Sequence, residues 1–192
     1  NTFKNCSYSG NIKMNGSFAA RTTVGGLVGY NSANYFNMEN CHSSGSITFV
    51  NNYTGTEVNN FIGIGGIIGY DGQEIGYTSC SNSMDISVSG FCKATNPLWV
   101  GGIVGYDSRN NTKGSVMNVK NSGNITIGSI DRKTTVNALQ VGGIGGYIKN
   151  SAAITGYENL VNTGDIFLEG EIVGFDGVVS DVATPSYVGG IF

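Results

Sequence analysis

The sequence predicts an all-β fold, a parallel β-solenoid of about five coils with roughly 40 residues each. Three observations carry this prediction: a glycine-rich block that recurs along the chain, a polar block that recurs between its copies, and an alternation of apolar residues after the polar block. Repeats of this length with short strands and glycine corners are typical of a solenoid in which each repeat is one coil. We expect residues 1–192 to form one such domain, with three strands in each coil.

The composition agrees with many turns between short strands. Of the 192 residues, 31 are glycine and 2 are proline, while charged residues make up 12%, about half the usual share of roughly 25%. The net charge is −3, and no run of Lys or Arg occurs, which argues against a nucleic-acid-binding surface. No apolar run approaches the length of about 18 residues that a membrane-spanning helix needs.

The glycine-rich block reads Val-Gly-Gly-Ile-Val-Gly-Tyr at residues 100–106. Its copies start near residues 24, 64, 100, 141 and 188, and the fifth copy is cut off by the end of the chain. A phosphate-binding loop would require a helix N-terminus after the glycines. Because no helical pattern follows any copy, we interpret the block as one strand of each coil, with glycine where two backbones approach closely.

The polar block reads Asn-Cys-x-x-Ser-Gly-x-Ile in its first two copies. If the coils stack, equivalent residues form ladders with a spacing of about 4.8 Å. The last position of the block is isoleucine in every copy: Ile12, Ile47, Ile86, Ile125 and Ile166. The residues two positions later are also apolar: Met14, Phe49, Val88, Ile127 and Leu168. This spacing of two marks the inward face of a strand.

Two further ladders come from the start of the polar block. One contains Asn5, Asn40, Asn118 and Asn159, with Ser79 in the third copy, and is expected to form hydrogen bonds from coil to coil at the corners. The other contains Cys6, Cys41 and Cys80 and continues as Val119 and Leu160, which indicates an apolar core position.

The redox state of the four cysteines stays open at this point. A disulfide between two stacked cysteines is the alternative to free thiols, because the rung spacing lies within the Cα separation of roughly 4.4–6.8 Å that a disulfide allows. Cys92 is expected in the loop before Trp99, without a partner.

A tyrosine column follows the glycine-rich block and contains Tyr30, Tyr70, Tyr106 and Tyr147. We predict a packed or partly packed aromatic ladder. An exposed platform for sugars is the alternative.

The sequence offers no catalytic cluster. Asp71 and Asp107 follow equivalent tyrosines, and Asp85 and Asp165 share the column before the isoleucines. We interpret all four as solvated turn residues, with weak calcium binding as the alternative. Asp85 and Asp165 would lie two coils apart, about 10 Å, at or beyond the ~6.5–9.5 Å of inverting glycosidases. With His42 as the sole histidine, we expect no enzyme activity and no catalytic, cofactor-binding or metal site.

Potential N-glycosylation sequons begin at Asn15, Asn52, Asn110 and Asn124. The first three are expected in loops. A further sequon begins at Asn5, which we expect to be inaccessible within its ladder.

The sequence from Val24 to Tyr30, followed by Glu-Asn-Cys-x-x-Ser-Gly-x-Ile at residues 39–47, resembles the GLUG-type repeat. That repeat occurs in large bacterial surface proteins, including adhesin-like proteins and the non-catalytic regions of IgA-cleaving metallopeptidases. The copies depart from its pattern at four positions: Met84, Val119, Gly145 and Leu160. The resemblance implies a β-solenoid in a secreted or surface-anchored protein, and it implies no activity and no catalytic residues.

We therefore expect a non-catalytic structural or interaction module of an extracellular surface protein, such as an adhesin stalk, a spacer or a filament subunit. Its expected partners are a second copy stacked head to tail or adjoining repeats of the parent chain, and possible further partners are host or matrix glycans and proteins. Because no cap is evident, we expect either a fragment or an uncapped subunit. The alternative function is a polysaccharide-binding or polysaccharide-degrading β-helix with a lateral groove. The handedness of the coil stays open.

Overall fold

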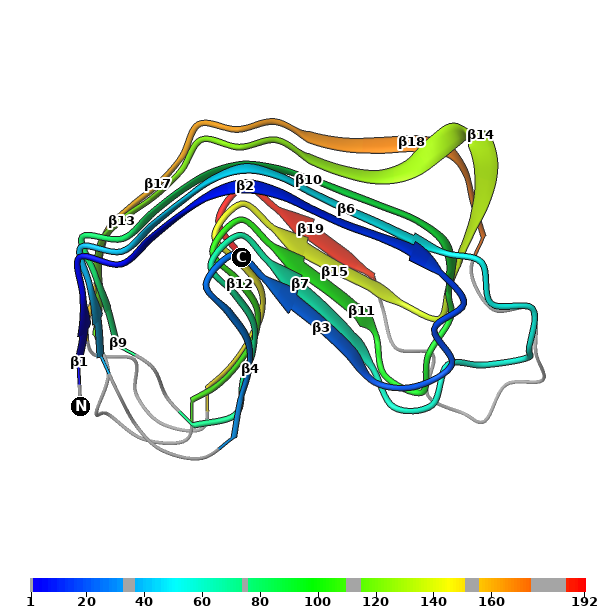
Figure 1. Cartoon of the computed structure of the whole chain (residues 1–192), viewed down its shortest axis with the longest axis horizontal. Coiled ribbons are helices and arrows are strands. Elements are labelled where there is room, and N and C mark those ends of the chain that lie inside the picture. Colours follow the sequence, from blue (N-terminus) through cyan, green and yellow to red (C-terminus); the bar gives the residue numbers. More distant parts are fainter. Residues whose placement is uncertain (1, 33–36, 74–75, 110–114, 151–155, 174–185) are drawn as a thin grey trace.

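The chain folds as an all-β parallel β-solenoid, as the sequence predicts. The computed structural model describes residues 2–32, 37–73, 76–109, 115–150, 156–173 and 186–192. Figure 1 shows the coils lying one behind another, so that equivalent strands overlap in the view. Within the described residues, no helix has the length and apolar character needed to cross a membrane.

Each complete coil contains four strands rather than the three expected. In the second coil these are β5 (Asn37–Glu39), β6 (His42–Asn51), β7 (Ile62–Gly65) and β8 (Ile68–Asp71). The first coil contains β1 (Thr2–Lys4), β2 (Ser7–Gly16), β3 (Thr22–Gly25) and β4 (Val28–Asn31). The third contains β9 (Gly76–Thr78), β10 (Ser81–Cys92), β11 (Leu98–Gly101) and β12 (Val104–Arg109).

The remaining strands continue the same order. The fourth coil contains β13 (Val116–Asn121), β14 (Ile125–Val136), β15 (Leu139–Gly142) and β16 (Gly145–Asn150). The described part of a fifth coil contains β17 (Tyr157–Asn162), β18 (Ile166–Val173) and β19 (Tyr187–Gly189). The structure thus comprises about four turns with a spacing of about 39 residues, followed by these three strands.

All strand pairs are parallel and join neighbouring coils. The strands β3, β7, β11, β15 and β19 form one sheet, and β4, β8, β12 and β16 form another. The long strands pair in the register that the sequence predicts, so that Ile47 lies opposite Ile12 and Ile86, and Ile125 lies opposite Ile86 and Ile166. The isoleucine ladder and the apolar ladder two residues later are therefore confirmed.

The glycine-rich block is not one strand, which corrects the sequence interpretation. Its Gly-Gly pair forms a corner between two strands, for example between β11 and β12. A Cβ atom at Gly101 would overlap the carbonyl oxygen of Val104 across the corner, and one at Gly102 would overlap the carbonyl oxygen of Gly143 in the next coil. Glycine is required here because the backbones approach closely, as expected, and this close approach is what allows the sharp turn.

The corner divides the interior into two cores (Figure 1), because the long strands arch over both shorter sheets. The larger core lies between the long strands and the sheet of β7 and contains residues such as Phe49, Ile64 and Ile86. The smaller core includes Cys41, Ile67 and other buried side chains from the strands on the far side of the corner. Burial of these apolar side chains is the main stabilising contribution to the coils.

A ladder of buried amides lies where the two cores meet. The Ser43 hydroxyl donates to Asn82 Oδ1, Asn82 Nδ2 donates to Asn121 Oδ1, and Asn121 Nδ2 donates to Asn162 Oδ1, each over 2.8 Å. A Cβ atom at Gly102 would overlap the Asn121 amide, so the ladder packs directly against the Gly-Gly corners. The amides also form hydrogen bonds within their own coil; for example, the Met84 backbone N–H donates to Asn82 Oδ1 at 3.0 Å. These buried polar groups are therefore satisfied.

Candidate functional site

The cysteine ladder lies in the smaller core. Cys41, Cys80 and Val119 are buried, and Cys6 and Leu160, at the two ends of the column, are half-buried. All four cysteines of the chain are free thiols, so the structure contains no stacked disulfide. Burial raises the pKa of the Cys41 thiol, and it raises the pKa of Cys80 to about 11. These thiols are protonated at neutral pH and pack as small apolar side chains.

Cys92 does not lie in a loop, which corrects a second expectation. It is the last residue of β10, lies in register with Val136 of β14 and is fully buried in the larger core. Burial raises its pKa to about 12. The strand is longer than the sequence suggested, because it continues past the bend at Gly90, whose φ is +89°.

The predicted asparagine ladder forms its expected hydrogen bonds on the surface. Asn40 Nδ2 donates to Asn5 Oδ1 at 2.7 Å, and Asn159 Nδ2 donates to Asn118 Oδ1 at 2.9 Å. All members of the column have left-handed backbone angles, with φ of 52–55°: Asn5, Asn40, Ser79, Asn118 and Asn159. Asparagine tolerates this conformation better than most residues, so the column is explained by the turn as well as by the hydrogen bonds.

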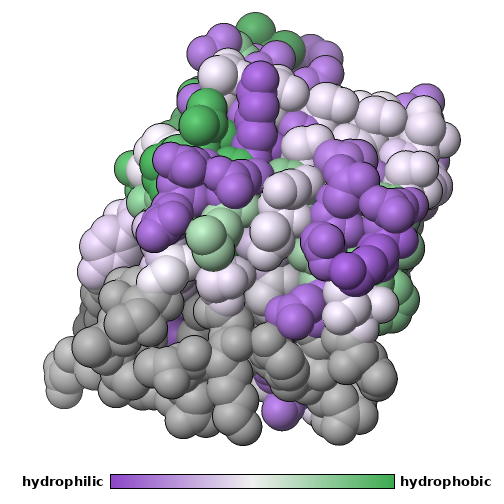
Figure 2. All heavy atoms as spheres, turned by 90° about the vertical axis from the view of Figure 1, so that its left-hand side faces the viewer, coloured by the Kyte–Doolittle hydropathy of each residue, from purple (hydrophilic) through white to green (hydrophobic). Residues whose placement is uncertain are grey.

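Figure 2 shows the face to which the strands β1, β9, β13 and β17 contribute, and hydrophilic side chains gather there beside a hydrophobic edge. The exposed asparagines Asn5 and Asn40 lie between a short strand and a long strand, whereas Asn118 and Asn159 lie within β13 and β17. Lys4 and Glu39 pair on neighbouring strands of this sheet, at 2.7 Å, and both side chains are about half exposed. An ion pair with this exposure contributes little stability, so this face is best regarded as a solvated surface.

Asp71 and Asp107 are buried rather than solvated, which overturns their interpretation as exposed turn residues. Both have no exposed surface, and they lie in register on β8 and β12. Asp71 Oδ1 accepts hydrogen bonds from Asn31 Nδ2 and from the Gln73 backbone N–H, each at 2.9 Å. For Asp71, a side chain of the neighbouring coil and a backbone N–H of its own turn therefore replace water, which makes burial of the carboxylate tolerable.

Asp85 and Asp165 are exposed, as expected for solvated residues. Asp85 Oδ1 accepts the Asn124 backbone N–H at 2.8 Å, and Asn124 Oδ1 accepts the Asp165 N–H at 2.9 Å. The column thus joins successive coils through side-chain-to-backbone bonds. Among the residues that the structure describes, no three His, Cys, Asp or Glu side chains come together in a way that could hold a metal ion.

The sequons lie in different parts of the coils. Asn15 lies within β2 rather than in a loop, and its Oδ1 accepts a hydrogen bond from Asn52 Nδ2 at 2.7 Å. Asn52 follows β6, and Asn124 lies between β13 and β14. Asn110 lies outside the described residues. Asn5 is exposed despite its place in the asparagine ladder.

The tyrosine column forms a continuous stack along the outer side of the sheet of β8. Its ring centroids lie 5.0, 4.7 and 5.3 Å apart, with interplanar angles of 15°, 4° and 17°, in the order Tyr30, Tyr70, Tyr106 and Tyr147. Tyr30 is 38% exposed, and the other three are half-buried. The partly packed ladder expected from the sequence is therefore present, with ring edges that remain accessible.

Aromatic side chains from the adjacent strands pack against this stack across the corner. The Trp99 ring lies 4.4 Å from the Tyr106 ring, and the Phe61 ring lies 4.6 Å from the Tyr70 ring, centroid to centroid. Burial raises the pKa of Tyr70, and the neighbouring Tyr106 and Tyr30 hydroxyls raise it further. Burial likewise raises the pKa of Tyr106. Both hydroxyls are therefore protonated at neutral pH and can donate as well as accept hydrogen bonds.

Sequence reasoning identified the tyrosines but missed the cleft beside them. We call it the aromatic cleft; it has a volume of about 290 Å³ and is lined by Asn96, Pro97, Trp99, Tyr106, Gln140, Tyr147 and Lys149. Trp99 is only 6% exposed, and its Nε1 donates to Gln140 Oε1 at 2.7 Å. The bond holds the Gln140 amide in a fixed orientation at the base of the cleft.

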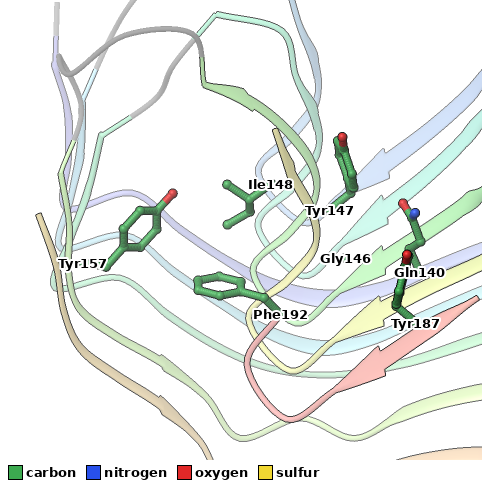
Figure 3. Close-up of a pocket in the computed structure, with 7 residues that line it drawn as sticks. All are labelled: Gln140, Gly146, Tyr147, Ile148, Tyr157, Tyr187 and Phe192. Atoms are coloured by element: carbon green, nitrogen blue, oxygen red, sulfur yellow. The ribbon is translucent and has the colours of Figure 1, made fainter. Parts of the chain in front are cut away.

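A second hollow lies at the last coil. It has a volume of about 320 Å³ and is lined by Gln140, Gly146, Tyr147, Ile148, Tyr157, Tyr187 and Phe192. Figure 3 shows these side chains on both sides of the edge of β16, with Ile148, Tyr157 and Phe192 on one side and Tyr147, Gln140 and Tyr187 on the other. The hollow therefore lies over the edge of a strand that has no outer neighbour among the described residues.

The two end faces of the stack expose residues that are buried in the inner coils. Leu168 in the last coil is 53% exposed, whereas Ile127, its neighbour in the same ladder, is fully buried. In the first coil, Ile12 and Met14 are half-buried, whereas their register partners in the second coil are buried. The difference arises because a rung at an end is covered on one side only.

Comparison with known proteins identifies one repeat motif. The GLUG motif matches residues 20–48, which include one glycine-rich block and the polar block that follows it. The other coils place the same residue types at the same register positions, so the chain is a β-solenoid that contains a GLUG motif in one of its repeats. No curated protein and no solved structure matches the chain.

Proposed function

We propose that this GLUG-repeat β-solenoid is a non-catalytic structural module of an extracellular surface protein, where it serves as a stalk, spacer or filament segment. One observation carries the proposal: both end faces expose the ladder residues and strand edges that the inner coils use to bind one another. A surface of this kind is complementary to another coil of the same type. The resemblance of the repeat to those of bacterial surface proteins supports the extracellular assignment.

The mechanical role follows from the continuity of the ladders. Hydrogen bonds between parallel strands join every pair of neighbouring coils, and the isoleucine and amide ladders run through the interior. Such an array resists bending, because bending would separate rungs that are held by both backbone and side-chain bonds. Its partners are coils of the same type, either in adjoining repeats of the parent chain or in a second copy.

The proposal is tested by electron microscopy of the purified chain at increasing concentration, with two variants of the exposed strand β18. Leu168→Lys places a charge on the inward ladder of the end face, whereas Phe167→Lys places one on the adjacent residue, which is 42% exposed. Phe167 lies opposite Thr126, a polar residue, rather than on the apolar ladder. We expect rods longer than one chain for the wild type and for Phe167→Lys, and single short rods for Leu168→Lys.

Single short rods for the wild type at every concentration would contradict the proposal. Equal loss of association in the two lysine variants would also contradict it, because that result would indicate a general effect of charge rather than ladder stacking. Circular dichroism of each variant provides the control for correct folding.

A further inference from the structure

We infer that the aromatic cleft binds an acidic linear polysaccharide, aligned with the tyrosine stack along the axis of the coils. The proposed structural role leaves this feature unexplained, because a stalk needs no outward aromatic column. Packing alone would be served by apolar side chains, whereas this column presents a hydroxyl group at each rung from Tyr30 to Tyr147.

The cleft has the composition of a saccharide site. The stacked rings of Tyr106 and Tyr147 present their edges and hydroxyls to the cleft, while Gln140 and Asn96 provide amides beside them. Sites for small ligands typically combine aromatic walls with a few well-placed polar groups. Saccharides match this combination, since their many hydroxyls need both donors and acceptors, which the tyrosine hydroxyls and the amides supply.

The polar groups of the cleft are held in place before a ligand arrives. Gln140 is only 5% exposed, and its Oε1 accepts the Trp99 indole N–H at 2.7 Å, which directs its Nε2 group away from the indole as a donor. Tyr106 is fixed between Tyr70 and Tyr147 in the stack. A fixed site loses little side-chain entropy on binding, which favours affinity in a shallow cleft.

The periodic arrangement favours a polymer over a single sugar. Four tyrosine rungs follow one another at about the inter-strand spacing of 4.8 Å, so similar contacts recur along the axis. Tyr30, at the start of the column, is the most exposed of the four. A linear chain that occupies the cleft at Tyr106 and Tyr147 can therefore continue over Tyr70 and Tyr30.

Charge decides between an acidic and a neutral polysaccharide. Among the described residues that line the cleft, Lys149 is the one that is charged, and it is exposed. At the other end of the column, the Arg21 guanidinium lies 4.4 Å from the Tyr30 ring centroid, and its Nη1 donates to the Tyr30 hydroxyl at 3.1 Å. Two cations along one aromatic column, in a chain of net charge −3, are complementary to the carboxylates of a uronic acid polymer.

The same lining favours binding over cleavage. A glycosidase needs two carboxyl groups that flank the scissile bond, and none of the described residues that line the cleft is an Asp or Glu. Asp107 follows Tyr106 in the sequence but is fully buried. The inference therefore concerns recognition of a polysaccharide and not its degradation.

The test is affinity gel electrophoresis of the folded chain through gels that contain polygalacturonate, an acidic linear polymer, or hydroxyethylcellulose, a neutral one. We expect polygalacturonate to retard the wild type more strongly than hydroxyethylcellulose does. Lys149→Gln should weaken the binding of polygalacturonate about tenfold, the effect of one charge-assisted contact. Lys120→Gln, which removes an exposed lysine that does not line the cleft, is the matched control and should change affinity less than about twofold.

Tyr106→Phe tests the contribution of the hydroxyl alone, because the variant keeps the aromatic ring and its packing in the stack. We expect it to weaken binding about threefold without loss of folding, as for one neutral hydrogen bond. The inference is overturned if neither polymer retards the wild type, if the neutral polymer binds more tightly, or if Lys120→Gln and Lys149→Gln weaken binding equally. The rod-formation test uses Leu168 and Phe167, neither of which lines the cleft, so failure of this inference leaves the proposed structural role to be judged by its own test.

Discussion

An inner coil and an end coil of this solenoid have the same residues in the same ladders but differ in how their side chains are covered. Ile86, in the third coil, is 1% exposed, whereas Ile166, in the fifth coil, is half-buried. The sequence pattern is therefore not sufficient to bury a side chain. A coil becomes part of the core when a coil lies on each side of it, which is the behaviour expected of a repeat protein stabilised by contacts between neighbours.

The largest effect should come from a charge in the isoleucine ladder. Ile86→Asp buries a carboxylate between Ile47 and Ile125, and we expect it to lower the free energy of unfolding by several kcal/mol or to prevent folding. Ile166→Asp leaves the carboxylate partly in water, and we expect a loss of about 1 kcal/mol. Urea denaturation followed by circular dichroism measures both. Equal losses would show that the end coil is as well covered as the inner one.

A smaller effect should come from one methyl group at the Gly-Gly corner. Gly102→Ala would place Cβ against the Gly143 carbonyl oxygen and the Asn121 amide, and overpacking of this kind costs about 1–3 kcal/mol. Gly190 is in the same position of the last copy of the block, and a Cβ atom there would meet no atom within 4 Å. Gly190→Ala should therefore leave the midpoint of urea denaturation almost unchanged. A similar loss in both variants would assign the glycine requirement to backbone conformation rather than to the neighbouring coil.

The smallest effect should appear at alkaline pH. Burial raises the pKa of Cys80 from 9.0 to about 11 and that of Cys92 from 9.0 to about 12. The unfolded chain then loses these protons first, so stability is fully present below pH 9 and falls as the pH rises from about 9 to 12. Cys80→Val, which introduces the residue that Val119 provides in the same column, should reduce this fall.

Thermal denaturation between pH 8 and pH 11 measures the difference. Tyr70 and Tyr106, whose pKa values burial also raises, should account for part of the decline that remains in the variant. An identical alkaline decline in the wild type and in Cys80→Val would refute the assignment to the cysteine ladder.

The ladders could be predicted because residues of the same type recur at equivalent positions of the repeat and therefore stack on one another. Isoleucine occurs at one position in every copy, and that identity alone sets the register of the long strands. The buried amide ladder escaped prediction because its column begins with Tyr8 and Ser43 before it reaches Asn82. Asp71 and Asp107 were misread as solvated. For Asp71, a single sequence does not show that Asn31 of the neighbouring coil and the Gln73 N–H lie within hydrogen-bond distance of its carboxylate.

The aromatic cleft was beyond the reach of the sequence for a geometric reason. The repeat pattern aligns the four tyrosines in one column. Trp99 and Gln140, however, belong to strands on the other side of a corner and come from different coils. Their contact with Tyr106 and Tyr147 depends on the angle at the Gly-Gly corner, which the repeat pattern does not specify.

Hydrogen–deuterium exchange with peptide-level mass spectrometry tests most directly whether each coil is held by the coils on its two sides. The long strands β2, β6, β10, β14 and β18 share one ladder but differ in the number of neighbours. The account predicts the slowest exchange in β6 and β10 and the fastest in β2 and β18, because end strands open without disturbing the rest. Uniform protection across all five strands, or slower exchange in β18 than in β10, would contradict it.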